Sequence, residues 1–462
     1  MVIKVFNYFK NLGLTSLASF FSGHVRTVKI KKNILAMLIL RGMSIVFGFL
    51  LVPMTLHYLN PTNYGIWLTL TSVIGWFSFF DIGLGNGLRN KFAVAIAQGD
   101  ILLARMYVST TYAFLSAITG IVFTIFFLVN PFLDWSILLN APEGFSGELS
   151  LLMLITFGFF CLRFVFGLIG TILIADQKPA LNSLLEVLSN VISLTLIWIL
   201  ISTTEGSLLK LSIAVGFSTA IVPIGASFWF FNRKYKNVRP SWAFVKKTHA
   251  SELVQLGLRF FLLQIVGVVI FSTSNVIIAQ LFSPADVVPY NIAFKYYSII
   301  TMGLTIILSP FWSAYTEAYI RNDVVWIRRT IKVLRRGWYV AAIVVVVMSL
   351  FADKFYQYWI GKDIHVSLSI SLSMGIYVLI IAWCNIYAYF INGTGKIQLQ
   401  IISSVIIGIV NIPLAIFLAK YCGLGIAGVI LAPSICILPG CILWPIQVKK
   451  IISGTATGIW AK

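Results

Sequence analysis

Four basic residues interrupt long apolar stretches of this sequence. Arg41, Arg163, Arg259 and Lys295 each lie in a run that is otherwise almost free of charge. A charge in such a run faces a polar cavity or a partner, because hydrocarbon does not solvate it. Arginine offers an anion a planar fork of donors, and lysine offers a point charge. The four residues therefore predict a cationic ladder for an anionic ligand, and the alternative is that Arg41 and Arg259 snorkel to the interface.

Acidic residues in the same kind of run are candidates for gating or ion coupling. Asp81, Glu186 and Glu317 lie near the ends of apolar runs. Each could titrate, or could neutralise a cation, as Asp81 would with Arg89 and Glu186 with Arg163. The sequence contains no zinc-protease, P-loop or paired-carboxylate metal motif. We therefore expect a protein that is not an enzyme and has no cofactor, with a proton or sodium ion as the coupling ion.

The glycines of DIGLGNGLRNK, residues 81–91, look at first like a phosphate-binding loop. A dinucleotide fingerprint has the spacing GxGxxG after a short strand, whereas GxGxG here follows a long apolar run. We therefore exclude nucleotide binding. The stretch predicts a helix end, a bend at the glycines, and a short amphipathic helix with Leu88, Phe92 and Ala95 on one face. Arg89 and Lys91 would then face lipid phosphates.

Membrane-spanning helices must position these residues. The chain has 462 residues, of which 59% are hydrophobic and only 10% charged, whereas soluble domains carry about 25% charged residues. The mean hydropathy is +0.95. Runs of roughly 20 apolar residues can cross a bilayer. We count about 12 of them, which start near residues 33, 64, 107, 149, 181, 211, 252, 288, 337, 366, 397 and 425.

The net charge of +20 is distributed as the positive-inside rule predicts. Most basic residues fall in alternate connections between the apolar runs, which predicts that both termini are cytoplasmic and argues against nucleic-acid binding. The five cysteines lie mostly in apolar runs and form no CxxC motif. We expect them to be small apolar packing residues.

The apolar runs divide into two similar halves. LNPTNYG at 59–65 and FSPADVVPY at 282–290 each follow an apolar run that carries an arginine, and each places a proline in the first turn. We predict a cytoplasmic, partly amphipathic segment over 1–32, a six-helix bundle over 33–231, a basic linker over 232–250, a second six-helix bundle over 251–448 and a cytoplasmic tail over 449–462. Two such halves are typical of transporters that hold the substrate between them.

Two stretches resemble a known family. NPTNYGIWLTLTSVIGWFSFFDIGLGNGLRNK, residues 60–91, resembles the early region of O-antigen and related polysaccharide flippases of the multidrug/oligosaccharidyl-lipid/polysaccharide export superfamily. SPFWSAYTEAYIRNDVVWIRR, residues 309–329, resembles a second family landmark. The resemblance implies two six-helix bundles in a V around a central cavity. It also implies transfer of an undecaprenyl-pyrophosphate-linked oligosaccharide between the leaflets of the bacterial inner membrane.

On this hypothesis Arg41 and Arg259 capture the pyrophosphate, and Arg163 and Lys295 accompany it through the cavity. Tyr290, Tyr296, Tyr297 and Trp312 would either stack on sugar rings or serve as ordinary packing residues. We expect a monomer whose partners are the lipid-linked oligosaccharide, the bilayer, a glycan polymerase and a chain-length regulator.

Three other functions compete with this one. A drug or cation exporter of the same superfamily would need carboxylates in its cavity, and bases dominate here. A membrane glycan polymerase or ligase would need a large outside loop with Arg and His. A scaffold of the glycan machinery would have no need of charges inside its spans.

Overall fold

The computed structural model describes residues 25–78, 83–142, 146–176, 178–248, 250–252 and 273–461. These residues form helices joined by short turns, and no strand occurs in the described ranges. Ten helical segments among them are long and apolar enough to cross a membrane. The predicted second span contains α4 (Pro61–Trp76), which has 16 residues, and the predicted seventh span lies mostly within 253–272, outside the described residues. The all-α, multi-pass membrane architecture is thus confirmed.

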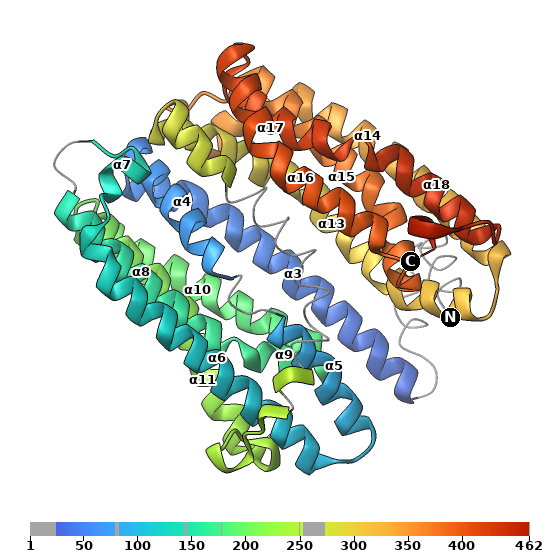
Figure 1. Cartoon of the computed structure of the whole chain (residues 1–462). Helices are drawn as coiled ribbons and strands as arrows, with labels where there is room; N and C mark the ends of the chain where they lie inside the picture. The colour runs from blue at the N-terminus through green and yellow to red at the C-terminus, as the bar shows by residue number, and fades with distance from the viewer. Residues whose placement is uncertain are drawn as a thin grey trace.

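The helices form two groups that lie side by side (Figure 1). The N-half, blue to green in Figure 1, is followed by a linker with the turns η4 (Lys236–Val238) and η5 (Trp242–Phe244). The N-half consists of α3 (Val25–Tyr58), α4, α5 (Leu84–Ala97), α6 (Ile101–Val129), η3 (Asn130–Phe132), α7 (Trp135–Leu139), α8 (Ser146–Phe166), α9 (Leu168–Ala175), α10 (Pro179–Thr203) and α11 (Leu208–Asn232).

The C-half, yellow to red in Figure 1, begins in its described part with the helical residues 273–281. It continues with η6 (Pro284–Asp286), α13 (Val287–Ile320), α14 (Val324–Ile360), α15 (Leu368–Thr394), α16 (Gln398–Ile416), the π-helical turn η7 (Phe417–Tyr421), α17 (Gly425–Ile437), α18 (Gly440–Ile452) and η8 (Gly458–Trp460). Residues 1–24 of the predicted amphipathic segment lie outside the described residues, and 25–32 form the first turns of α3.

Two ends of the molecule are distinguished by charge. The basic end holds α5, α9, the linker after α11 and the start of α14. The opposite end holds the turns after α3, α7, α10 and α14. In Figure 1 the basic end lies toward the lower right and the opposite end, with α7, toward the upper left. The positive-inside rule predicts that the basic end is cytoplasmic.

The two proline turns that suggested a repeat begin in the same way. The Asn60 side chain accepts a hydrogen bond from the Asn63 N–H at 2.8 Å, with Pro61 in the first turn of α4. The Ser283 side chain accepts one from the Asp286 N–H at 3.3 Å, with Pro284 in the first turn of η6. A polar cap followed by proline favours helix initiation, because the cap accepts a hydrogen bond from a free N–H of the first turn and proline has no N–H that needs a partner.

Two of the predicted spans are interrupted rather than continuous. The fourth span turns at Gly167, between α8 and α9, and the Phe166 carbonyl that faces this break accepts a hydrogen bond from the Ser227 hydroxyl of α11 at 3.3 Å. The twelfth span turns at Pro439, between α17 and α18. Proline has no N–H to continue a helix. A side-chain partner for the freed carbonyl allows such a break inside a membrane.

The glycine-rich stretch at the basic end behaves largely as predicted. Gly83 has φ of +76°, which glycine adopts without strain, and α5 begins directly after it. Leu88, Phe92 and Ala95 of α5 are buried together, so the amphipathic helix is confirmed. Lys91 does not face lipid as expected, because its ammonium donates to the Glu252 carboxylate at 3.0 Å.

Candidate functional site

Lys295 lies where the two halves touch. It is on α13, and its Nζ atom is 2.9 Å from the position that a Cβ atom on Gly48 of α3 would occupy. Glycine at position 48 therefore leaves room for the ammonium group between the helices. Lys295 forms no ion pair with any residue that the structure describes. A lysine without a counter-ion between two membrane helices requires either water or an anionic ligand.

Arg41 lies on the same face of α3 as Gly48. The two positions are seven residues apart, which is two helical turns and roughly 10 Å along the axis. Arg41 interacts electrostatically with Tyr389 of α15, so it faces the C-half. α3 thus carries Arg41, and two turns further toward the opposite end it carries the glycine that receives Lys295. Arg41 and the Lys295 ammonium therefore both lie along one face of α3, about two turns apart.

Arg163 and Glu186 interact within the N-half. Arg163 is in the last turn of α8, beside the break at Gly167. It interacts electrostatically with Glu186 of α10, although no direct ion pair joins them. The Asn182 side-chain amide donates to the Glu186 carboxylate at 3.0 Å. Neutralisation of Arg163 by Glu186 stays a prediction, which this electrostatic interaction favours.

The pairing of residues between α3 and α10 places Glu186 and Arg41 at nearly the same position along the helix axes. Two hydrogen bonds join these parallel helices: Asn190 to Ser44 at 3.1 Å, and Tyr58 to Thr204 at 2.9 Å. Both join residues 146 positions apart in the sequence. The same offset places Glu186 level with residue 40. Arg41 and Glu186 thus lie at one level, with Lys295 further toward the opposite end. Three cations minus one carboxylate leave a net charge of +2.

The remaining predicted residues are not placed. Arg259 and Asp81 lie outside the described residues. Glu317 is near the end of α13, and its side chain lies outside the described part of the structure. The structure therefore tests neither the match between Arg41 and Arg259 nor the pairing of Asp81 with Arg89.

The predicted aromatic residues divide into two kinds. Tyr290, Tyr296 and Tyr297 are buried in the main core. The Tyr296 hydroxyl donates to the Met348 carbonyl at 3.1 Å, and the Tyr297 hydroxyl bonds Ser349 at 2.8 Å. These three are packing residues.

Trp312 differs, because it is 37% exposed and packs edge-on against Tyr389 with ring centroids 6.0 Å apart. Tyr389 is a functional candidate that sequence reasoning missed. It is one of 18 tyrosines, and no charge or spacing distinguishes it.

The opposite end is closed by uncharged contacts between the halves. A Cβ atom on Gly65 of α4 would overlap the Pro284 carbonyl of η6, so the two proline turns meet backbone to backbone. The Asn140 amide donates to the Ala279 carbonyl at 2.8 Å, and the Asn275 amide donates to the Ser72 hydroxyl at 2.7 Å.

Three further hydrogen bonds join the halves toward the same end. The Gln280 amide donates to the carbonyls of Ile137 and Leu138, both at 2.7 Å. Nearer the middle of α3, the Trp359 indole N–H donates to the Phe49 carbonyl at 3.0 Å. We call this set of cross-half contacts the closed end.

Comparison with solved structures decides the fold. The chain superimposes on an inward-facing MATE family multidrug resistance transporter of the MOP superfamily with a TM-score of 0.75, at 14% identity over 91% of this chain and 98% of that one. The outward-facing conformation of a MATE family transporter of the same superfamily gives a TM-score of 0.67, at 17% identity over 92% and 96%. This chain therefore has the fold of the MOP superfamily transporters.

Two curated proteins similar to this chain are named for O-antigen. It is 24% identical over 351 residues to a Salmonella typhimurium protein named "Putative O-antigen transporter", covering 74% of this chain and 78% of that one. It is 23% identical over 372 residues to a Yersinia pseudotuberculosis protein named "Putative O-antigen export protein", covering 78% and 82%. No family model matches the chain.

Proposed function

We propose that this chain, which has the fold of the MOP transporters, is a flippase for undecaprenyl-pyrophosphate-linked oligosaccharide units, which it moves from the inner to the outer leaflet of a bacterial inner membrane. The observation that carries the proposal is the pair of cations on one face of α3, Arg41 and the Lys295 ammonium received by Gly48. Neither has an anionic partner among the described residues. An anionic cargo between the halves would supply one.

A pyrophosphate suits these two groups in different ways. The Arg41 guanidinium can donate two parallel hydrogen bonds to one phosphate group, which fixes its orientation. The Lys295 ammonium sits two turns further along and can attract the same charge without fixing its orientation. The order in space suggests capture at Arg41 and then transfer toward Lys295. The polyprenyl tail would remain in lipid, and Trp312 and Tyr389 offer apolar faces to a sugar ring.

The closed end supports a direction for this transfer. With the opposite end held shut, a ligand reaches Arg41 from the basic end, which the charge distribution predicts to be cytoplasmic. Release then requires the closed end to separate, as alternating access demands. Glu186 is the acid that we propose for ion coupling, because protonation would leave Arg163 without its counter-charge. A polymerase and a chain-length regulator would take the product at the outer leaflet.

Complementation in a strain that lacks its own O-antigen flippase tests the proposal. Wild type would be compared with Arg163→Ala, Lys295→Ala and Arg41→Ala at equal membrane levels. The matched control is Lys420→Ala, which removes an exposed cation of η7 that lies off the ladder. We expect wild type and control to restore surface glycan and the ladder variants to lose most of it.

Two results would contradict parts of this proposal. Full restoration by all three ladder variants would show that the cations do not handle the cargo, while the flippase function would stand. Failure of wild type in strains of several O-antigen structures, together with export of cationic dyes, would favour a drug exporter.

A further inference from the structure

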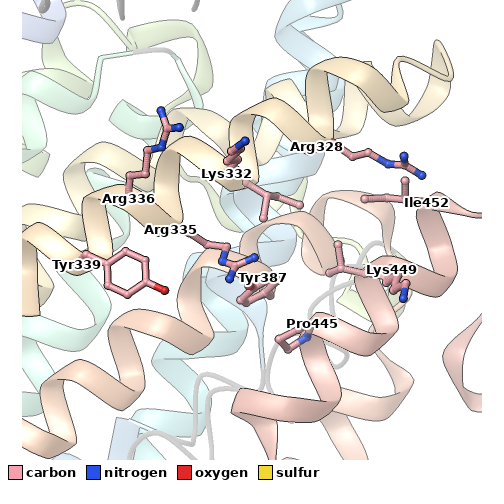
Figure 2. A pocket seen from close by; sticks show the side chains of 11 residues that line it. Arg328, Lys332, Arg335, Arg336, Tyr339, Tyr387, Pro445, Lys449 and Ile452 are labelled. Carbon is pink, nitrogen blue, oxygen red and sulfur yellow. The ribbon is translucent and has the colours of Figure 1, made fainter.

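A second cationic site lies away from the space between the halves. A groove of about 760 Å³ at the basic end is lined by residues of α14, α15 and α18. We name it the α14–α18 groove. Its five cations are Arg328, Lys332, Arg335 and Arg336 of α14 and Lys449 of α18. Figure 2 shows Arg335 extending toward Tyr387, with Pro445 and Lys449 presented by the facing helix.

The cations gather there because of helical spacing. Positions 328, 332, 335 and 336 of α14 recur every three or four residues and so share one face of the helix. Ile327, Thr330 and Leu334, on the other face, are buried. Like charges at this spacing repel one another. No acidic residue lines the groove, and none of the five cations forms an ion pair with a described residue. The groove therefore concentrates uncompensated positive charge.

The groove does not open onto the candidate functional site. Tyr387 is the residue of α15 that lines the groove, whereas the residue of α15 that interacts with Arg41 is Tyr389. Two residues along a helix are separated by about 200° around its axis. Tyr387 and Tyr389 thus lie on nearly opposite faces of α15. A ligand in the groove would be separated from cargo on α3 by the thickness of α15.

The surroundings of the groove indicate a lipid rather than a soluble anion. Apolar side chains of Ile331, Val448 and Ile452 line it together with the cations. Toward the middle of the membrane, α14 continues with Val340 and Ile343, which are 61% and 66% exposed. Ile442 of α18, on the facing side, is 64% exposed. Basic residues at the level of the lipid headgroups can bind the phosphate of a phospholipid, and the adjacent apolar face can contact its acyl chains.

We propose that the α14–α18 groove binds the headgroup of an anionic glycerophospholipid of the leaflet at the basic end. Lys332, Arg335 and Lys449 contact its phosphate groups, and Tyr339 and Pro445 contact the upper part of its acyl chains. Lipid-linked pyrophosphate shares the chemistry of a phosphate on a lipid. The separation from α3 by α15 favours the phospholipid as the occupant.

Lipid titration of the full-length protein in detergent, followed by native mass spectrometry, tests this site. The probes are cardiolipin, phosphatidylglycerol, phosphatidylethanolamine, undecaprenyl pyrophosphate and inorganic pyrophosphate. The groove variant combines Lys332→Gln, Arg335→Gln and Lys449→Gln. The control variant combines Arg329→Gln, Lys236→Gln and Lys247→Gln, which removes the same charge from exposed positions of the basic end outside the groove. Thermal unfolding without lipid checks that both variants are folded.

We expect the groove variant to bind the two anionic phospholipids roughly 100-fold more weakly, since each basic residue contributes about a fivefold factor. The control variant should bind them as wild type does, and phosphatidylethanolamine should bind weakly to all three. Equal losses in both triple variants would overturn the proposal, because the attraction would then be a general effect of charge. Selective loss of undecaprenyl pyrophosphate, with phospholipid binding kept, would assign the groove to the cargo and would also overturn it. If the groove variant does not fold, equal wild-type affinity for cardiolipin and phosphatidylethanolamine would overturn it.

Discussion

The two ends of the contact between the halves are built from different chemistry. The closed end uses amides, hydroxyls and bare backbone, as in the Asn275–Ser72 hydrogen bond and the approach of Gly65 to Pro284. Toward the basic end the facing groups are Arg41 on α3 and Tyr389 on α15. Neutral hydrogen bonds contribute about 1 kcal/mol each and break readily. Cations without counter-ions at the basic end favour separation of the two halves there until an anionic ligand binds. The closed end can therefore yield when cargo draws the basic end together.

The largest effect should come from filling the space at Gly65. In a Gly65→Val variant the new side chain would overlap the Pro284 carbonyl, and no rotamer can relieve an overlap with Cβ. We expect the closed end to be lost and transport to cease. Spin labels at Lys210 and Lys362, placed in a background without the native cysteines, would report a longer distance between the halves.

Gly120→Val is the matched control for this variant, because no atom lies within 4 Å of the added Cβ there. An unchanged distance distribution in Gly65→Val would mean that the closed end does not depend on this backbone approach.

Removing amide bonds should weaken the closed end without abolishing it. Asn275→Ala with Gln280→Ala removes hydrogen bonds to Ser72 and to the Ile137 and Leu138 carbonyls. At about 1 kcal/mol for each of the three lost bonds, the population with this end open should rise about 150-fold in the same distance measurement. Gln357→Ala, which loses only a bond to Asp353 within α14, should leave the population unchanged. A shift of equal size in that control would refute the role of the cross-half amides.

At the level of Arg41, charge should set anion affinity. The site has three cations and the Glu186 carboxylate, which give a net charge of +2. Glu186→Gln removes the carboxylate and raises the net charge to +3. We expect inorganic pyrophosphate to bind about threefold more tightly, because the added Coulomb attraction is partly screened by water. Isothermal titration calorimetry measures this, with Glu205→Gln at the opposite end as the control. Weaker binding in Glu186→Gln would mean that the carboxylate organises Arg163 rather than competing with the anion.

The smallest effect should come from the Lys91–Glu252 ion pair, whose side chains are 33% and 44% exposed. The hydrogen bond that the Lys91 ammonium donates to the Glu252 carboxylate raises the pKa of Lys91 above its usual value. The pair therefore stabilises the fold at neutral pH, and this contribution is lost as the pH rises above about 10.4, through the folded pKa.

We expect Glu252→Gln to lower the melting temperature slightly at pH 7, in keeping with less than about 1 kcal/mol for exposed pairs. The difference from wild type should shrink at pH 11, whereas exposed Asp363→Asn should change nothing at either pH. A difference that grows with pH would contradict the assignment.

The architecture followed from the sequence because a bilayer imposes a simple rule on chains of this composition. Helices such as α10 and α15 must satisfy their backbone internally and be apolar over about 20 residues. The sequence did not predict the helix breaks at Gly167 and Pro439, because a span with an internal break has nearly the same hydropathy as a continuous one. The Ser227 hydroxyl that caps the first break comes from another helix, and sequence spacing does not report such a contact.

Candidate site residues were predictable only where they carried a charge. Arg41 and Lys295 stood out in apolar runs; the structure places Arg41 on α3 and the Lys295 ammonium of α13 against Gly48 on the same face of α3. Tyr389 carries no charge and was missed. Lys91 was assigned to lipid because its partner, Glu252, is 161 residues away in the sequence. The α14–α18 groove was missed because Lys449 comes from a helix more than a hundred residues after the basic face of α14.

The length of α14 has a consequence for the membrane itself. Its 37 residues span about 55 Å, whereas the hydrocarbon core is about 30 Å thick. The helix is therefore insensitive to hydrophobic mismatch at its basic end, where the extra turns lie beyond the acyl chains. In a thicker bilayer the acyl chains can cover more of α14. The helices α15 and α16 are shorter, with 27 and 19 residues, and cannot match the same increase in thickness. Bilayer thickness should thus alter the tilt of the C-half, and with it the ease with which the two halves rock past each other.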